Sequence, residues 1–311
     1  MTLAELPLGL AERTCELGEL GAPEDHEDDD ENDEELANPD VRHGMSVPVL
    51  VVAVNVSLGR AGAALDRIVL AAGNDLLDLH ADEHHNRSVL TVTGEGAARA
   101  VAAAAVEVID LRGHVGVHPR FGAVDVVPFV PFGGATMADA LAARDRFMTW
   151  IAETLGVPAF RYGTDGPSLP DVRRLAFRGL APDAGPSDPH PTAGAVAVGA
   201  RGPLVAYNVW LATPDLALAR RVAAAVRSPG IRALGLPVGG RVQVSMNLVD
   251  PGQVGPAEAY DAVAGLAPVA GAELVGLIPE VVLRAAAPER WTELGLDAGC
   301  SVEARLASGG R

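Results

Sequence analysis

Two histidines and an arginine precede an apolar segment in residues 113–131, GHVGVHPRFGAVDVVPFVP. The proline that follows His118 favours an extended backbone at this histidine. The neighbouring glycines allow backbone conformations that a loop requires. The β-branched, apolar run from Ala123 is typical of a buried strand. An imidazole titrates near neutral pH, so His118 beside Arg120 suits proton transfer on an anionic substrate. The alternative is that both side chains only satisfy loop backbone groups and a nearby carboxylate.

Residues 77–94, LDLHADEHHNRSVLTVTG, form a second dense group of polar side chains between two predicted strands. Histidines and carboxylates at close spacing can bind zinc or iron. A metal-assisted hydrolase that uses His80, His84, His114 or His118 is therefore one alternative. Neither four-residue histidine spacing forms a recognised ligand motif, so we predict no metal. For His84 and His85 the alternative interpretation is that they belong to a loop of charged side chains exposed to solvent.

Other catalytic patterns are absent from the sequence. The chain contains no lysine and no GxGxxG between a strand and a helix, which excludes a Walker-type phosphate loop and argues against a dinucleotide site. A serine nucleophile elbow is also missing, and neither Cys15 nor Cys300 has a histidine nearby in the sequence.

The acidic charge of the chain is concentrated near its N-terminus. The net charge is -17, yet residues 1–44 hold 15 of the 41 acidic residues and only 2 of the 24 basic ones. This segment is predicted to be a disordered acidic leader, with the fold starting at Met45. Neither part offers the clustered basic surface that nucleic-acid binding requires. The chain has 311 residues and is 49% hydrophobic, which is enough for two domains.

The sequence shows neither a secretory signal nor an apolar stretch long enough to cross a bilayer. Its two cysteines do not make a disulfide framework and are compatible with a reducing compartment. We therefore expect a cytoplasmic protein without membrane association.

Strand-like and helix-like segments alternate along the chain, which predicts a mixed α/β protein with local crossovers. The expected strands are 47–55, 75–80, 87–93, 123–130, 158–162, 204–211, 231–238, 242–249 and 273–278. The expected helices are 60–72, 97–110, 215–226, 279–286 and 288–294, one that begins at Pro256, and one that Thr136 caps with Asp139 and that ends at residue 155. Residues 163–194 are rich in Pro, Gly, Asp and Ser, which indicates a long loop or linker.

Eight motifs spread over residues 49–279 together resemble the glutamate formiminotransferase family. They are VNVSLGR (54–60), DLHADEHHNRSVLTVTG (78–94), HVGVHPRFGAVDVVPFVP (114–131), LAPDAGP (180–186), GAVAVGAR (194–201), YNVWL (207–211), VQVSMNLVD (242–250) and ELVGLIP (273–279). Their order and spacing follow the family, and the length leaves no room for the cyclodeaminase domain of its bifunctional members.

The resemblance implies two subdomains, 45–203 and 204–311, each a mixed sheet with helices on its outer face, enclosing a groove for tetrahydrofolate. It places the catalytic histidine at His118. It places folate-binding loop positions at Gly185, Pro186, Ser187 and Gly194. Further groove candidates are Asn55, Asp78, His80, Asn86, Arg87, Arg120, Arg201, Asn208 and Asn247. His80 and Val117 stand where the family has acidic residues.

The leading hypothesis is a transferase that moves a formimino group between N-formimino-glutamate and tetrahydrofolate, with tetrahydrofolate as co-substrate. An alternative is a non-catalytic folate or pterin binding protein of the same fold, which the two missing acidic residues favour. The expected partners are small molecules, and a homodimer is the expected assembly.

Overall fold

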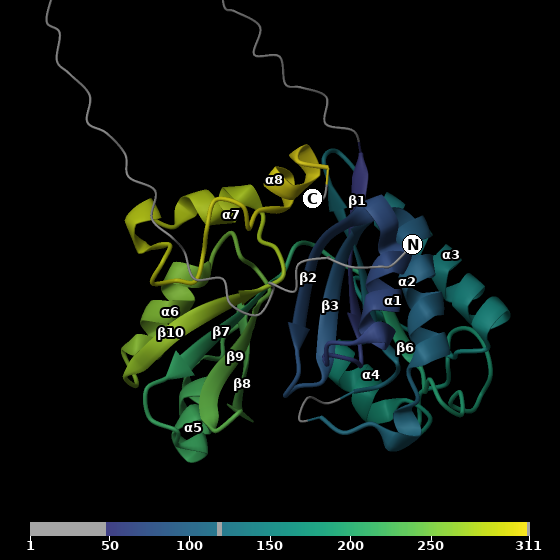
Figure 1. Ribbon diagram of the computed structural model, residues 1–311, viewed down its shortest axis with the longest axis horizontal. Coiled ribbons are helices and arrows are strands. Elements are labelled where there is room, and N and C mark those ends of the chain that lie inside the picture. Colours follow the sequence, from purple (N-terminus) through teal and green to yellow (C-terminus); the bar gives the residue numbers. More distant parts are fainter. Residues whose placement is uncertain (1–47, 117–119, 310–311) are drawn as a thin grey trace, which may run out of the picture. The chain divides into compact units, whose positions relative to one another are not determined.

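The computed structural model describes residues 48–116 and 120–309. The predicted acidic leader, 1–44, and the predicted catalytic His118 lie outside these ranges. The described strands form two sheets within one folded unit of the chain (Figure 1).

The first sheet has six strands in the order β2-β3-β1-β4-β6-β5. Their bounds are β1 Val49–Val56, β2 Leu76–Asp82, β3 Arg87–Thr93, β4 Val124–Phe132, β5 Ala159–Gly163 and β6 Val196–Ala200. The pairs β1 with β3, β1 with β4, and β2 with β3 are antiparallel, whereas β6 runs parallel to both β4 and β5. The sheet is therefore mixed, as expected.

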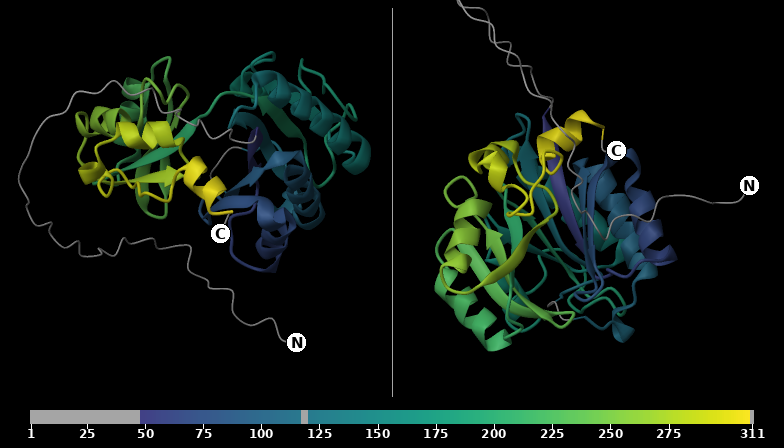
Figure 2. Two further views of the ribbon diagram at one scale, coloured as in Figure 1. Left: turned by 90° about the horizontal axis from the view of Figure 1, so that it is seen from above. Right: turned by 60° about the vertical axis from the view of Figure 1, so that its left-hand side comes forward.

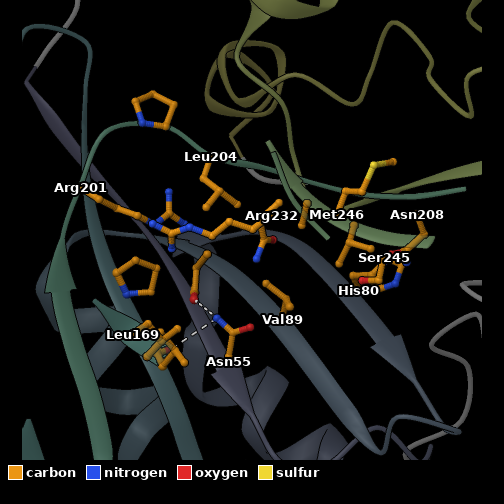
Figure 3. Close-up of a pocket in the computed structure, with 18 of the residues that line it drawn as sticks. Asn55, His80, Val89, Leu169, Arg201, Leu204, Asn208, Arg232, Ser245 and Met246 are labelled. Carbon is orange, nitrogen blue, oxygen red and sulfur yellow. Dashed lines mark hydrogen bonds between the residues drawn. The ribbon is translucent and has the colours of Figure 1, made fainter. Parts of the chain in front are cut away.

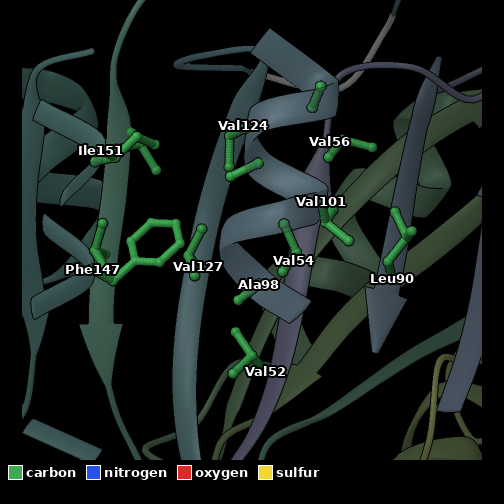
Figure 4. Close-up of a cluster of buried hydrophobic side chains, with 14 of the residues drawn as sticks. Val52, Val54, Val56, Leu90, Ala98, Val101, Val124, Val127, Phe147 and Ile151 are labelled. Atoms are coloured by element: carbon green, nitrogen blue, oxygen red, sulfur yellow. The ribbon is translucent and has the colours of Figure 1, made fainter. Parts of the chain in front are cut away.

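Three helices cover one face of the first sheet: α1 Ala63–Ala72, α2 Gly94–Val108 and α3 Met137–Leu155 (Figure 1). Every second residue of β1, Val52, Val54 and Val56, is fully buried beneath them. Alanines of α2 and aromatic residues of α3 complete this core (Figure 4). The predicted cap of α3 is confirmed, because Thr136 Oγ1 accepts a hydrogen bond from the backbone N–H of Asp139 and the Asp139 carboxylate binds back.

The second sheet has four strands in the order β10-β7-β9-β8, and all its pairs are antiparallel. The strands are β7 Val205–Leu211, β8 Ile231–Val238, β9 Arg241–Leu248 and β10 Val269–Val275. The second sheet is thus antiparallel where a mixed sheet was expected, since β10 with β7, β7 with β9 and β8 with β9 are all antiparallel pairs. Helices α5 Leu216–Val226 and α6 Pro256–Ala264 pack on one face, against alternate residues such as Tyr207, Val244 and Leu248.

The segment predicted to be a loop or linker is more ordered than its composition indicates. It contains α4 Leu169–Leu175, and β6 follows it directly. Ser168 caps α4 by accepting a hydrogen bond from the backbone N–H of Asp171. Hydrophobic residues of α4 pack with Phe160 and Tyr162 of β5. The interpretation as a linker is therefore wrong.

Short elements complete the described chain: 3-10 turns η1 Gly73–Asp75, η2 Leu111–Gly113 and η3 Pro288–Arg290, and helices α7 Glu280–Ala285 and α8 Val302–Ala307. Helix α8 lies beside β2 (Figure 1, Figure 2), where Val302 is buried with Val51 and Leu77. The predicted helix 288–294 is only the three-residue turn η3. No helix among the described residues is long and apolar enough to cross a membrane.

Candidate active site

A cavity of about 790 Å³ lies between the open faces of the two sheets. Strands β1, β3 and β4 supply one wall, β7, β8 and β9 supply the other, and the start of α4 closes part of the side. Because successive strand residues point to opposite faces, the neighbours of the buried valines of β1 line it, namely Val51, Ala53 and Asn55. Figure 3 shows side chains from both sheets in this space.

The lining of the cavity is rich in arginine. Five arginines contribute to it, against a single carboxylate, that of Asp82. The arginines are Arg87, Arg173, Arg201, Arg227 and Arg232. An acidic chain therefore encloses a locally positive cavity, and such a field favours an anionic ligand.

Asp125 holds two of these arginines from behind the cavity. Its carboxylate is fully buried and accepts hydrogen bonds from Arg87 Nη1 at 2.5 Å and Arg173 Nη2 at 2.6 Å. The backbone N–H of Phe121 donates to its other oxygen at 2.5 Å. Arg87 Nη2 also donates to Asn55 Oδ1 at 2.8 Å. These hydrogen bonds fix the direction of two guanidinium groups that line the cavity. The single negative charge of Asp125 balances one of their two positive charges, so the cluster carries a net positive charge.

Arg201, just after β6, and Arg232, on β8, extend toward one another across the cavity (Figure 3). Burial lowers the pKa of Arg201, contact with the Tyr162 hydroxyl opposes that effect, and the charge of Arg232 lowers the pKa further. Within residues 48–116 and 120–309 neither guanidinium has a carboxylate partner. Two facing guanidinium groups form a suitable site for a carboxylate, which can accept hydrogen bonds from both.

His80 of β2 is supported by a carboxylate from the second sheet. Its Nε2 lies 3.6 Å from Glu273 Oε1 of β10, and Asn208 Nδ2 of β7 donates to Glu273 Oε2 at 3.1 Å. His80 and Asn208 line the cavity, whereas Glu273 lies behind them. The separation of 3.6 Å between His80 and Glu273 is within range of an ion pair but longer than a hydrogen bond. Glu273 thus supplies an acidic group next to position 80, where this chain has a histidine.

His85 forms a closer pair with Asp82. His85 Nδ1 lies 2.8 Å from Asp82 Oδ2, and the His85 backbone N–H donates to Oδ1 at 2.8 Å. Burial raises the pKa of Asp82, but these bonds outweigh it and lower the pKa to about 2. His85 is only 8% exposed, so the interpretation of it as a solvated residue is wrong; His84 is exposed as expected.

The chain on both sides of residues 117–119 is anchored beside this pair. Asn86 Nδ2 donates to the Val115 carbonyl at 2.9 Å, and Arg120 Nη2 donates to the Gly116 carbonyl at 2.8 Å. A Cβ atom at Gly116 would come within 2.5 Å of the His85 carbonyl oxygen, so only glycine fits there. Gly116 therefore lies next to His85, which lines the cavity, and Arg120 is held close to Gly116.

Comparison with known proteins connects this site to a family. Residues 49–201 match the Formiminotransferase domain, N-terminal subdomain. A glutamate formimidoyltransferase of Streptococcus pyogenes serotype M1 is 36% identical over 265 residues, which are 74% of this chain and 88% of that protein. The chain belongs to the glutamate formimidoyltransferase family.

Further members of this family are similar to this chain over most of its length. A glutamate formimidoyltransferase of Thermoplasma acidophilum is 32% identical over 290 residues, 81% of this chain and 95% of that protein. The formimidoyltransferase-cyclodeaminase of Sus scrofa is 36% identical over 277 residues, but these make up only 51% of its length. The predicted resemblance to the formimidoyltransferases is confirmed.

Most of the groove candidates predicted from this family resemblance come together in the cavity. Six of the nine line it: Asn55, His80, Arg87, Arg201, Asn208 and Asn247. The other three lie elsewhere: Asn86 binds Gly59 and Val115, Arg120 binds Gly116, and Asp78 Oδ1 lies 3.9 Å from Arg305 Nη2 of α8. The functional role of each candidate stays a prediction.

The predicted folate-binding loop positions of the formimidoyltransferase family are not among the lining residues. A Cβ atom at Gly185 would meet Ala152 of α3, and Gly194 pairs with Gly122 and His190. Pro186 and Ser187 are exposed between them. The structure does not bring these four residues together with the arginines, and their role also stays a prediction.

Sequence reasoning missed several cavity residues. Arg173 was hidden because its segment resembled a linker, although the SLPD cap of α4 was a usable signal. Arg232 and Gln243 lie on correctly predicted strands, but their strand patterns gave no sign that they face a cavity. Among the described residues, no group of three or more His, Cys, Asp or Glu side chains is arranged to hold a metal ion.

Proposed function

We propose that this chain transfers the formimino group between N-formimino-glutamate and tetrahydrofolate. The observation that carries this proposal is the facing pair Arg201 and Arg232 in an arginine-rich cavity of a glutamate formimidoyltransferase family member. Both substrates carry carboxylates, and guanidinium groups bind carboxylates through paired, charge-assisted hydrogen bonds. The arginines held by Asp125 provide a second fixed position for such a group.

The reaction exchanges one amine for another at the amidine carbon. N5 of tetrahydrofolate attacks that carbon, a C–N5 bond forms, and the bond to the glutamate nitrogen breaks. The proton lost from N5 must be taken up, and the departing glutamate nitrogen must receive one. A group that titrates near neutral pH serves both steps.

We assign this proton transfer to His118, on the basis of the family resemblance. Supporting this assignment, Val115 and Gly116 are held next to Asn86 and His85, and His85 lines the cavity. The pair His80 and Glu273 would help to orient the substrate in the cavity. Small-molecule substrates, a homodimer and a cytoplasmic location complete the proposal.

The test is a transfer assay with tetrahydrofolate and N-formimino-glutamate in which released glutamate is measured. Wild-type protein should release glutamate only when tetrahydrofolate is present. His118→Ala should lower kcat by about 10² to 10⁴-fold while tetrahydrofolate still binds, and His84→Ala, which changes an exposed histidine, should match wild type. Wild-type protein that binds tetrahydrofolate without releasing glutamate would favour the non-catalytic alternative. Unchanged turnover in His118→Ala would remove His118 from the mechanism.

A further inference from the structure

The side-chain amide of Gln243 has no hydrogen-bond partner in the described part of the chain. The residue is only 1% exposed, and both Nε2 and Oε1 are buried and unpaired. Gln243 belongs to β9, and it lines the cavity. Buried polar groups in folded proteins are nearly always hydrogen-bonded, so an unpaired amide facing a cavity requires an explanation.

The position of Gln243 on the sheet gives it mainly apolar neighbours. Leu236 of β8 is directly opposite it on one side and Trp210 of β7 on the other. Val242 and Val244 point into the core on the opposite face, whereas Gln243 points to the cavity face. Leu236 lines the cavity beside Gln243, whereas Trp210, whose ring is stacked by Arg241, lies outside the lining. This part of the cavity therefore combines an apolar side chain with one amide.

The arginine site lies farther along the same face. Arg232 is opposite Asn247, which is four residues from Gln243 on β9. At about 3.3 Å per residue, this is a distance of roughly 13 Å along the strand. The cavity thus has two chemically different regions: an amide with apolar neighbours, and a pair of guanidinium groups.

We infer that Gln243 binds the aminopyrimidinone edge of the pterin ring, with the glutamate part of the folate directed toward Arg201 and Arg232. A primary amide carries an N–H donor beside a C=O acceptor. The pterin edge offers the matching pair, a ring N–H beside a carbonyl oxygen, on a flat ring that can pack against Leu236. This inference rests on the proposed function, because it assigns the two regions to two parts of tetrahydrofolate.

The first test uses wild-type protein and depends on the small number of glutamines. Gln243 and Gln253 are the two glutamines of the chain, so glutamine-selective ¹⁵N labelling gives two side-chain amide pairs. Gln253 is exposed and binds Asp250, and it serves as the internal control. Adding 6-methyltetrahydropterin should shift the Gln243 amide signals and leave those of Gln253 in place. Unshifted Gln243 signals with bound pterin would overturn the inference.

The second test compares two fragments of folate on Gln243→Met and on the control Gln253→Met. Gln243→Met should weaken binding of 6-methyltetrahydropterin by about 10 to 100-fold, because two hydrogen bonds are lost. Binding of 4-aminobenzoyl-glutamate should change by less than about twofold. Gln243→Met should melt no lower than wild type, since it removes an unpaired amide from the protein interior. Equal weakening of both fragments, or of neither, would contradict the inference.

These outcomes separate the inference from the proposed function. A wild-type protein that transfers the formimino group while Gln243→Met binds the pterin normally would retain the function and refute the role of Gln243. A wild-type protein that does not bind tetrahydrofolate would refute both.

Discussion

Substituting Asp125 with asparagine should destabilise the fold and disturb the cavity together. The Asp125 carboxylate is fully buried and accepts three hydrogen bonds, from Arg87, Arg173 and the Phe121 backbone. Both arginines donate to the same Asp125 oxygen, and the Phe121 N–H donates to the other. Asparagine keeps one neutral acceptor oxygen, and in either orientation its NH2 group faces a donor, namely the Phe121 N–H or the two guanidinium groups. The variant therefore leaves two adjacent cationic side chains without their shared anion.

The size of the effect follows from this burial. The side chains of Arg87 and Arg173 are only 15% and 21% exposed, so water cannot fully replace the lost carboxylate. Removing one partner of a buried ion pair costs about 3–5 kcal/mol. For a domain of this size each kcal/mol lowers Tm by about 2–4 °C, so Asp125→Asn should melt roughly 6–20 °C below wild type.

Thermal melting followed by circular dichroism measures this change, and the transfer assay measures its effect on the cavity. Asp110→Asn is the matched control, because Asp110 pairs with Arg112 at an exposed position and surface pairs contribute little. Asp125→Asn should also raise the KM for both substrates, since Arg87 and Arg173 lose their fixed direction. A variant that melts within about 1 °C of wild type would refute the account of this cluster.

Two further predictions concern charges at the cavity. Arg232→Gln should raise the KM for tetrahydrofolate about 10 to 100-fold with little change in kcat. The control is Arg241→Gln, because the Arg241 side chain stacks on Trp210 outside the cavity lining, and this variant should leave the KM unchanged. Equal KM values for the two variants would contradict a carboxylate site at Arg232. Burial raises the pKa of Asp82, but hydrogen bonds from His85 outweigh it and lower the pKa in the folded protein to about 2, below its ordinary value of 3.8. Asp82 therefore stabilises the fold above about pH 4 and loses this contribution as the pH falls toward 2. Asp82→Asn should therefore lower the free energy of unfolding by roughly 1 kcal/mol at pH 7, after allowance for solvent screening. The loss should be several-fold smaller at pH 2, where the carboxyl group of Asp82 is about half protonated in the folded protein. Denaturant titrations measure both values, and an equal loss at the two pH values would contradict the assignment.

Local sequence signals predicted most of the elements. The strand predicted over 231–238 has the bounds of β8, the helix predicted to begin at Pro256 is α6, and the capped helix at Thr136 is α3. These succeed because alternation, caps and helix-starting prolines act over a few residues. Strand β6 was missed because VAVGA is buried throughout and shows no alternation.

The site depends on contacts that local patterns do not encode. Asp125 meets Arg87 and Arg173 from 38 and 48 residues away in the sequence. His80 and Glu273 meet from different sheets. Family motifs indicated six lining residues, but the missed arginines become visible only once the strand order and register are known.

The most direct test of the account is a comparison of two donors in the transfer assay, N-formimino-glutamate and N-formimino-glycine, with tetrahydrofolate held at saturation. We predict that kcat/KM for N-formimino-glutamate is higher by about 10 to 100-fold, because the cavity arginines bind its additional carboxylate. Equal values for the two donors, or no tetrahydrofolate-dependent release of glutamate, would contradict it.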